Sequence, residues 1–391
     1  MIIKRRLICS MVVLLCSMVG CSDDNGPNPD VGQDSSVDKS VGEAVTPDLP
    51  PAQDPTSFMT FNTGLAEGAV GFAKERQPLI IEELKKATAE VLCLQEVWAD
   101  SDAQAIIDGL KAIFPHSFRE KTEDTSTPKV RCELGAVLTL DGCVKTKCDP
   151  TGISASECVA DPALCKSDYD TLTDECKLCL AGNTANPTAC ALGGAKDFVY
   201  DGRNGLVLLS RYPMQDAKYT ALSTELIKRG VITATIGKVN VQCNHMPANL
   251  GVVPYPTGKP YASWVEEHAG VADDVVKTAP QSGCTVLMGD LNSGPAEGGL
   301  TGALEDNFKK FTTAGYQEPW STPQCTSCKD NPLAGSEEDT WIDHVMFKGC
   351  STSATYTYKR VMDGEVTVTP SGGTPQKTRL SDHYGLQAEM K

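Results

Sequence analysis

Short apolar runs recur along the chain after residue 55. Five of them carry an acid, an amide or an imidazole at or near one end and cover 58–63, 90–97, 239–245, 286–292 and 341–347. Continuous apolar runs of this kind are typical of strands buried inside a layered α/β fold. Catalytic groups usually lie where loops leave the ends of such strands. The pattern therefore predicts that the polar residues at these ends share one site: Asn62, Glu96, His245, Asp290 and Asp343.

Other segments carry the spacing of helices and paired strands. Residues 71–88 and 101–113 repeat apolar positions with the period of an amphipathic helix. Pro78, inside the first of these segments, predicts either a kink or a later helix start. Residues 229–236 and 238–244 predict a strand pair that turns between them. An order of strand, helix, strand, helix fits a layered α/β class.

The run 286–295 contains two polar residues close together that could belong to a catalytic site. Asp290 and Asn292 stand two residues apart after Gly289. At a strand end such residues point the same way, so one carboxylate and one amide can face a single small volume. The alternative is a capped turn, in which both side chains bind local backbone amides. This stretch alone does not decide between the two.

The first 54 residues lack any helical or strand period beyond one apolar run. Residues 1–20 combine the basic start Lys4-Arg5-Arg6 with an apolar core and small residues before Cys21, as in a lipoprotein signal peptide. We expect a lipidated Cys21 and an exported bacterial lipoprotein, anchored to a membrane and periplasmic or at the cell surface. The alternative is an uncleaved anchor, although the apolar run is short for a membrane span. Residues 21–54, rich in Asp, Pro, Ser and Gly, predict a disordered acidic linker.

The remaining body, residues 55–391, is strongly acidic. The whole chain carries a formal charge of −16; removal of the three signal-peptide cations gives −19, and the linker holds −7 of it, which leaves −12 for the body. An acidic body lacks the basic surface of a tight, non-specific nucleic-acid binder. The argument is mild, because a bound metal ion supplies positive charge locally. A double-sheet sandwich can reach this length as one domain.

Eight cysteines crowd residues 132–190, a segment poor in large apolar residues. Disulfides are the rule in exported proteins, so we predict a disulfide-rich insertion between sandwich strands, with pairings that the sequence does not choose. A zinc site at Cys176-Lys-Leu-Cys179 is the alternative, weakened because the segment holds no histidine. Cys325 and Cys328 are expected to pair with each other or with Cys350. Three further cysteines lie in apolar strands and are expected to be core residues or to form a buried pair: Cys93, Cys243 and Cys284.

The loop 247–260 is rich in Pro and Gly and lies next to His245 in the sequence. Its neighbourhood carries Tyr255, Tyr261 and Trp264. We expect these rings to pack onto their own domain, and contact with a lipid surface is the alternative.

The polar strand ends, taken in order, resemble the endonuclease/exonuclease/phosphatase superfamily of metal-dependent phosphoesterases. Each motif is short, but the ordered set spans roughly residues 57–391 and is specific. The resemblance implies a four-layer α-β-β-α sandwich, in which two facing sheets lie between helices. The matching residues are Asn62, Gln95-Glu96, Ser210-Arg-Tyr-Pro213, His245, Gly289-Asp-Leu-Asn292, Ile342-Asp343 and Ser381-Asp-His383.

The resemblance also implies a divalent cation. Glu96, Asn62 and Asp382 would place the ion. Oxygen ligands with few carboxylates suit Mg²⁺, which keeps several waters and shares its coordination sphere with phosphate. Mn²⁺ and Ca²⁺ are the alternatives.

Other residues that match the family would carry out proton transfer. By resemblance, His383 would be the general base toward the attacking water, oriented by Asp343, and Asp290 would help to position that water. Imidazole suits this work because its ordinary pKa is about 6.5. Asn292 and His245 would contact the phosphate, and His245 would protonate or stabilise the leaving group. The other histidines are assigned to structure: His116, His268 and His344.

The expected activity is hydrolysis of a phosphodiester. Arg229-Gly230 ahead of a strand, His245 and Ser381-Asp-His-Tyr-Gly385 favour the sphingomyelinase-like branch, with a lipid headgroup as substrate. The alternative within enzymes is an exported deoxyribonuclease or endonuclease that acts on nucleic acid. A different class is a non-catalytic surface-binding lipoprotein, which would have no chemical need for the complete set. We expect a monomer that meets the membrane through its N-terminal lipid anchor.

Overall fold

A computed structural model describes residues 53–67, 69–148, 155–183, 186–351, 353–370 and 373–391. The described residues belong to one compact unit, Pro50–Lys391. The predicted signal peptide (1–20), the lipidation site Cys21 and all but the last two residues of the predicted linker (21–54) lie outside the described residues. Of those two, Asp54 accepts a hydrogen bond from the backbone N–H of Lys238 through Oδ1 (2.7 Å).

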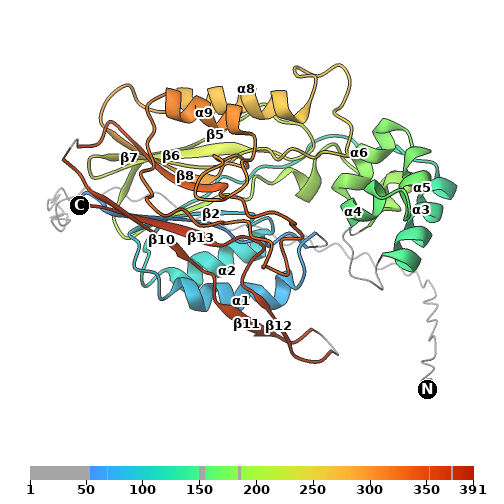
Figure 1. Cartoon of the computed structure of the whole chain (residues 1–391), viewed down its shortest axis with the longest axis horizontal. Coiled ribbons are helices and arrows are strands. Elements are labelled where there is room, and N and C mark those ends of the chain that lie inside the picture. The colour runs from blue at the N-terminus through green and yellow to red at the C-terminus, as the bar shows by residue number, and fades with distance from the viewer. Residues whose placement is uncertain (1–52, 68, 149–154, 184–185, 352, 371–372) are drawn as a thin grey trace, which may run out of the picture. The chain divides into compact units, whose positions relative to one another are not determined.

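Two sheets form the centre of this unit (Figure 1). The six-stranded sheet has the order β10-β13-β1-β2-β4-β3, and the five-stranded sheet has the order β5-β6-β7-β8-β9. The strands of the first sheet are β1 (Ser57–Asn62), β2 (Val91–Gln95), β3 (His116–Phe118), β4 (Val207–Ser210), β10 (Tyr356–Val361) and β13 (Gly385–Met390). Those of the second are β5 (Met214–Ala221), β6 (Gly230–Ile236), β7 (Val239–His245), β8 (Cys284–Asp290) and β9 (Asp343–Lys348). A separate ribbon pairs β11 (Glu365–Val368) with β12 (Gln376–Arg379).

Helices cover the outer faces of both sheets. Figure 1 shows α1 (Ala73–Leu84) and α2 (Asp100–Leu110) on one side and α8 (Trp264–Lys277) and α9 (Glu305–Thr313) on the other. The predicted helices at 71–88 and 101–113 and the predicted strand pair are therefore confirmed. Of the two alternatives for Pro78, the later helix start is wrong, because α1 begins at Ala73 and includes Pro78.

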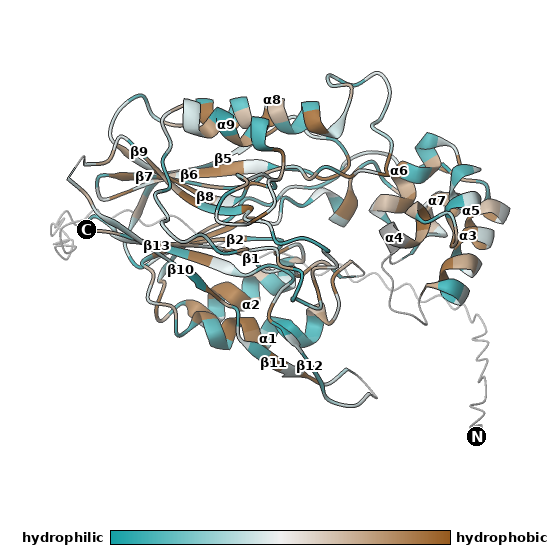
Figure 2. Cartoon of the chain, viewed as in Figure 1, coloured by the Kyte–Doolittle hydropathy of each residue, from teal (hydrophilic) through white to brown (hydrophobic). Residues whose placement is uncertain are grey.

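Three apolar cores separate these layers. The core between the sheets contains side chains from strands of both, such as Phe58, Val241 and Val286. A second core packs Leu92 and Leu94 against helix residues such as Ile80. The third lies beneath α8 and α9. The hydropathy colouring of Figure 2 shows brown strands in the interior and mixed faces on the helices. This arrangement confirms the four-layer α-β-β-α sandwich.

The cysteine-rich segment forms a helical insertion between β3 and β4 (Figure 1). It comprises α3 (Leu134–Lys147), α4 (Ala155–Ala160), α5 (Lys166–Asp170), α6 (Asp174–Gly182) and α7 (Ala189–Leu192), followed by the 3₁₀ helix η2 (Val199–Gly202). Four disulfides join it: Cys132–Cys176, Cys143–Cys165, Cys148–Cys158 and Cys179–Cys190. The predicted disulfide-rich insertion is confirmed, and a zinc site at Cys176 and Cys179 is wrong because each sulfur is bonded to another cysteine.

Three more disulfides lie in the sandwich. Cys93 of β2 pairs with Cys243 of β7 and so links the two sheets through the core. Cys325 pairs with Cys328, as one of the two alternatives predicted. Cys350, the partner named in the other alternative, pairs with Cys284.

Candidate active site

The sheet register brings five of the predicted residues to one edge of the sandwich. β1 and β2 are parallel, so Asn62 at the end of β1 lies beside Gln95, the residue before Glu96. β7 and β8 are also parallel, and His245 is paired with Asp290. The antiparallel strand β9 starts at Asp343, opposite Asp290. The strand ends that the sequence pattern singled out therefore meet, and the two sheets each contribute half of the site.

His383 and Asp343 form a hydrogen-bonded pair in this site. Nδ1 of His383 lies 2.8 Å from Oδ2 of Asp343, and Nε2 lies 3.9 Å from Oδ2 of Asp290. Because a carboxylate accepts hydrogen bonds, Nδ1 carries a proton and Nε2 faces Asp290. Burial alone would lower the pKa of His383, but the charges of Asp343 and Asp290 raise it well above its ordinary value. The pair has the geometry of an oriented acid–base residue.

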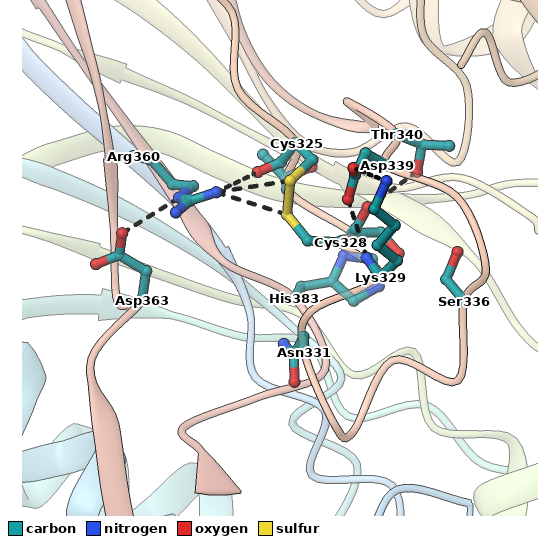
Figure 3. The surroundings of a disulfide bond; sticks show 12 residues. Cys325, Cys328, Lys329, Asn331, Ser336, Asp339, Thr340, Arg360, Asp363 and His383 are labelled. Carbon is teal, nitrogen blue, oxygen red and sulfur yellow. Dashed lines mark hydrogen bonds and ion pairs between the residues drawn. A yellow bond between two sulfur atoms is a disulfide. The ribbon is translucent and has the colours of Figure 1, made fainter. Parts of the chain in front are cut away.

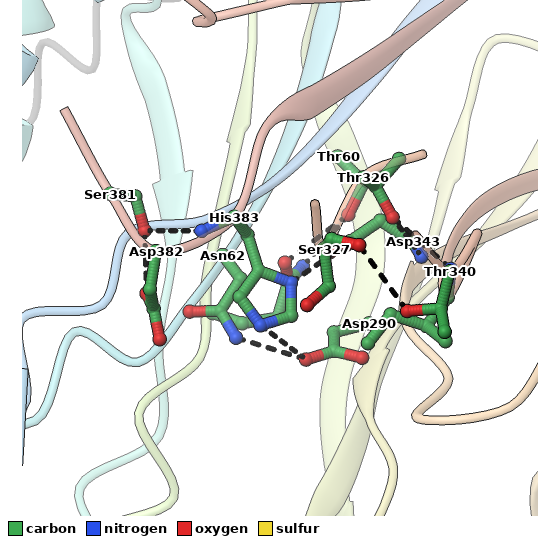
Figure 4. A network of polar contacts seen from close by, with 12 residues as sticks. Thr60, Asn62, Asp290, Thr326, Ser327, Thr340, Asp343, Ser381, Asp382 and His383 are labelled. Atoms are coloured by element: carbon green, nitrogen blue, oxygen red, sulfur yellow. Dashed lines mark hydrogen bonds and ion pairs between the residues drawn. The ribbon is translucent and has the colours of Figure 1, made fainter. Parts of the chain in front are cut away.

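Asp290 accepts hydrogen bonds at both carboxylate oxygens. Figure 4 shows Asn62 and His383 pointing at one of the two oxygens. Nδ2 of Asn62 donates to Oδ2 (2.9 Å), and the backbone N–H of Asn292 donates to Oδ1 (2.8 Å). Burial opposes ionisation, yet the His383 charge and the hydrogen bond with His245 lower the pKa of Asp290 below its ordinary value. The carboxylate is thus ionised and held rigidly. The local backbone bond that the capped-turn alternative predicted exists, but it acts within a site built from distant segments.

Asn292 lies in the left-handed backbone region, with φ 47°. Its Nδ2 donates to the backbone oxygen of Met246 (3.0 Å), which ties the loop after β8 to the loop after β7. Its predicted contact with phosphate would use the second N–H of the same amide. The structure therefore assigns Asn292 a positioning contact that the sequence did not indicate.

A disulfide-closed loop holds the acid of the pair. Thr326 lies between Cys325 and Cys328, and its hydroxyl accepts from the backbone N–H of Asp343 (3.0 Å). The Thr326 carbonyl accepts from the N–H of Tyr384, the residue after His383 (2.8 Å). Figure 3 shows His383 beside this loop. The small ring thus positions both partners. Sequence reasoning missed this role, because a Cys-Thr-Ser-Cys turn has no local mark of catalytic support.

His245 is buried and its two ring nitrogens have different neighbours. Nδ1 lies 2.5 Å from Nη1 of Arg229, and Nε2 lies 3.4 Å from Oδ2 of Asp290 and 3.9 Å from Oε1 of Glu96. Burial, together with the Arg229 charge, lowers the pKa of His245 to about 4. The ring is therefore neutral at pH 7 and acts as a hydrogen-bond donor rather than as a cationic acid.

Glu96 and Asp382 supply negative charge to the same site. Glu96 has φ 57° directly after β2, a conformation that non-glycine residues rarely adopt. Burial and the nearby Asp382 charge raise the pKa of Glu96 to about 7. Strained backbone that persists beside a set of charged groups is common at functional sites. Two partly buried carboxylates that repel each other suit a bound divalent ion as ligands.

Gly64 and Arg76 hold the segments that carry these ligands. A Cβ at Gly64, which has φ +53°, would collide with the Asp382 carboxylate. Arg76 is fully buried and donates to the backbone oxygens of Thr63, Gly64 and Leu380. One guanidinium therefore joins the loop after Asn62 to the loop before Asp382. Sequence analysis placed Arg76 only within a helix and missed this function.

An aromatic pair borders His245 and comes from outside the matched motifs. Trp98 stacks on Tyr200 with ring centroids 4.3 Å apart, and its centroid lies 6.3 Å from that of His245. Tyr200 belongs to η2, where the chain returns from the insertion, and has φ 51°. Gly205 lies so close to Trp98 that a Cβ there would overlap the indole. The segment that follows the insertion thus reaches the site through the Tyr200 ring.

Two of the remaining histidines, His344 and His268, have structural partners, as predicted. His344 faces away from Asp343 and bonds Glu318 (2.6 Å) and the Ser293 carbonyl (2.9 Å). His268 bonds the Leu291 carbonyl (2.8 Å). His116 lies in β3, away from the strand ends that form the site.

The loop 247–260 packs onto its own domain. Nε1 of Trp264 donates to the Val253 carbonyl (2.7 Å), and the Tyr255 ring meets the Trp264 ring edge to face. The hydroxyl of Tyr255 donates to Oε2 of Glu267 (3.0 Å). The expected packing is confirmed for these two rings.

Facing sheets with an Asp–His pair, a second buried aspartate and clustered carboxylates at their edge define a layered α/β phosphoesterase fold. The chain belongs to the Endonuclease/Exonuclease/phosphatase family, whose model matches residues 59–383. The matched range includes every residue predicted for the site. No curated protein sequence matches the chain.

Solved structures with the same fold are distant in sequence. A mutant of beta toxin from Staphylococcus aureus with bound magnesium ions superposes with a TM-score of 0.53 at 12% identity and covers 86% of this chain and 100% of its own. SmcL gives 0.51 at 12%, with 86% and 99% covered. Sphingomyelinase C from Streptomyces griseocarneus gives 0.50 at 15%, with 86% and 99% covered. These likenesses show the fold.

Within the described residues, helices are too short or too polar to cross a membrane.

Proposed function

We propose that this protein is a Mg²⁺-dependent phosphodiester hydrolase of the sphingomyelinase-like type. The observation that carries the proposal is the convergence of the His383–Asp343 pair and Asp290 with Asn62 and Glu96. These groups come from both sheets and from segments far apart in the sequence. A binding module would have no need to bury an acid–base pair beside several carboxylates.

The chain's own residues would divide the reaction as follows. Nε2 of His383 takes a proton from the attacking water while Asp343 holds the ring and balances its charge. Asp290, fixed by Asn62, accepts a hydrogen bond from the same water. The Nε2–H of His245 donates to a phosphate or leaving-group oxygen, where negative charge grows in the transition state.

Glu96, Asp382 and Oδ1 of Asn62 would hold the divalent cation. The fit rests on the two carboxylates, whose mutual repulsion and burial raise the pKa of Glu96 to about 7. When bound, the ion would neutralise these carboxylates, lower the charge on the phosphate and offset the field that raises the pKa of His383. Mg²⁺ suits a site with few protein carboxylates. The magnesium ions named for the beta toxin structure agree with this choice, and Mn²⁺ or Ca²⁺ are alternatives.

A sphingolipid headgroup is the proposed substrate. The support is the name of a neighbour with this fold, sphingomyelinase C, together with Arg229 next to His245. The formal charge of −16 disfavours tight non-specific nucleic-acid binding. The alternative substrate is DNA, and the protein would then be an exported deoxyribonuclease.

A three-substrate assay tests the proposal. Purified residues 55–391 are given sphingomyelin in mixed micelles, plasmid DNA and a phosphoinositide, each with Mg²⁺ and with EDTA. Sphingomyelin cleavage that EDTA abolishes and Mg²⁺ restores is the expected result. Cleavage of DNA alone would assign the nuclease function. Full activity in EDTA would overturn the metal role, and no cleavage of any substrate would favour a binding protein.

We also propose that the protein is exported and anchored to a membrane through a lipid on Cys21, as a monomer. The support is the basic start, the apolar core and the small residues before Cys21. Cys21→Ala in the full chain, expressed in a bacterium fed a labelled fatty acid, should lose the label and leave the membrane fraction. Retention of both would show that Cys21 is not the anchor.

A further inference from the structure

Arg229 is a buried cation whose role the motifs do not explain. It precedes β6 and its side chain is almost wholly enclosed, with 3% of its surface exposed. Its Nη1 lies 2.5 Å from Nδ1 of His245, and its guanidinium carbon lies 5.6 Å from the ring centroid of Trp98. Enclosing a guanidinium is costly unless its N–H groups are bonded, so this arrangement requires further partners.

The bond to His245 fixes which ring nitrogen carries the proton. A guanidinium only donates, so Nδ1 of His245 must accept and Nε2 must hold the hydrogen. The opposite tautomer would aim a lone pair at two acids, because Nε2 lies 3.4 Å from Asp290 and 3.9 Å from Glu96. Both ends of the ring therefore favour the same tautomer, and the N–H is aimed into the site.

Two buried polar atoms beside this contact have no partner among the described residues. They are Nε of Arg229 and Oε1 of Glu267. Glu267 lies in the first turn of α8 and is fully buried. Its other oxygen, Oε2, accepts from the Glu225 N–H and from the Tyr255 hydroxyl, both at 3.0 Å. An enclosed donor and an enclosed acceptor that both lack partners point to a bridging group.

A small cavity lies between these residues. Arg229 and Glu267 both line it, together with Glu225 and Trp264. Its volume of about 10 Å³, counted as space for the centre of a water molecule, corresponds to roughly one water. A donor on one side and an acceptor on the other give that water the two polar partners that buried waters need.

We propose that Arg229 is a positioning residue that fixes the tautomer of His245, and that one buried water joins its Nε–H to Glu267. The water accepts from Nε and donates to Oε1. Helix α8, through Glu267, thereby holds the guanidinium against His245. That the Nε2–H of His245 donates to a phosphate oxygen rests on the proposed function. The hydrogen bonds among His245, Arg229, the water and Glu267 do not depend on it.

The loop 247–260 is part of the same chain of contacts. Tyr255 reaches Oε2 of Glu267, and Trp264 both lines the cavity and holds the Val253 carbonyl. Residues that orient a reacting group through a hydrogen bond typically change rates by about tenfold to a hundredfold when removed. The loop is therefore coupled to His245 although neither ring enters the site.

Nitrogen NMR of the resting protein tests the tautomer without any substrate. In protein labelled with ¹⁵N-histidine, His245, assigned from the spectrum of His245→Ala, should show a protonated Nε2 and a non-protonated, hydrogen-bonded Nδ1. The Arg229 Nε–H should exchange slowly and show a cross-peak to a long-lived water. A proton on Nδ1 of His245 would overturn the proposal. This measurement needs no variant of Arg229 to fold.

Three variants test the series of hydrogen bonds that runs from His245 through Arg229 to Glu267. Arg229→Met should shift the Nδ1 signal of His245 to that of a nitrogen without a donor and lower kcat by about tenfold to a hundredfold with little change in KM. Glu267→Gln should speed exchange of the Arg229 Nε–H and lower kcat within about tenfold, the scale of one hydrogen bond. Glu266→Gln, an exposed neighbour on α8 with the same change of charge, should do neither.

The outcomes separate this proposal from the proposed function. Unchanged His245 signals in Arg229→Met, or equal Arg229 exchange in Glu267→Gln and Glu266→Gln, would overturn the chain of contacts even in an active enzyme. Absence of activity on every substrate, with the expected NMR signals, would overturn the proposed function and leave the hydrogen-bond chain standing.

Discussion

The sandwich and the insertion are stabilised by different means. The core between the two sheets has nineteen buried members, of which two are cysteines. The insertion's cluster has thirteen, of which eight are cysteines. The sandwich buries apolar strands and needs few cross-links. The insertion is too small to bury a comparable core, and short helices such as α5 and α7 depend on disulfides to stay together.

The two regions also differ in what they contribute to the candidate active site. Every predicted metal, acid–base and phosphate residue comes from the sandwich, at the ends of strands that packing holds in register. The segment that leads back from the insertion adds the Tyr200 ring, which stacks on Trp98, to the wall of the site. Sites built on rigid elements keep their geometry better than sites on loops. The insertion can therefore vary while the site is preserved.

Removing the disulfide between the sheets should cost the most stability. Cys93→Ala with Cys243→Ala opens a closed loop with a sequence separation of 150. The chain-entropy model gives a loss of about 5 kcal/mol in the free energy of unfolding. Urea unfolding followed by tryptophan fluorescence measures it. An unchanged midpoint would show that the apolar core alone sets the stability of the sandwich.

Opening the insertion should cost less and should stay local. Cys132→Ala with Cys176→Ala opens a loop with a separation of 44, for which the same model gives about 4 kcal/mol. We expect limited proteolysis to cut within 132–190 while the sandwich keeps its near-UV circular dichroism. If the sandwich melts at the same temperature as the opened insertion, the two regions fold as one unit and the comparison fails.

The sandwich was predictable because two features of the sequence mark each of its central strands. Apolar runs such as 90–95 and 284–290 mark buried strands, and the polar residue after each marks the edge where they end. The positions of Asn62, Glu96, His245 and Asp290 follow from these two features. His383 required the family resemblance, because a histidine in a loop has no periodic pattern around it.

The supporting contacts were not predictable, for a physical reason. Arg76 and Thr326 act through backbone atoms more than ten residues away, so nothing in their local sequence marks them. The pairings of the insertion cysteines depend on how short helices pack, which composition does not specify. The boundaries of exposed strands such as β5 escaped detection because their burial does not alternate cleanly.

Loss of the base in the sandwich should abolish most turnover and leave both regions folded. His383→Ala removes the proton acceptor, and general-base loss typically lowers kcat by about 10² or more. His116→Ala is the matched control, since His116 lies in β3 away from the site. Turnover and thermal melting are measured for both. Equal turnover in the two variants would remove His383 from the mechanism.

The smallest effect we expect is a pH dependence of the stability of the sandwich, caused by the titration of Glu267. Burial raises the pKa of Glu267 to about 7, so the folded state holds its proton more tightly than the unfolded state does. A carboxyl group with a raised pKa contributes stability that is present below its ordinary value, about 4.5, and is lost as the pH rises through about 7. A shift of this size corresponds to at most about 3–4 kcal/mol. Glu267→Gln stays neutral, so the melting temperature of the wild type relative to this variant should fall between pH 5 and pH 8. A difference that stays constant over this range would mean that Glu267 remains ionised throughout, and that its charge, rather than the bridging water alone, balances Arg229.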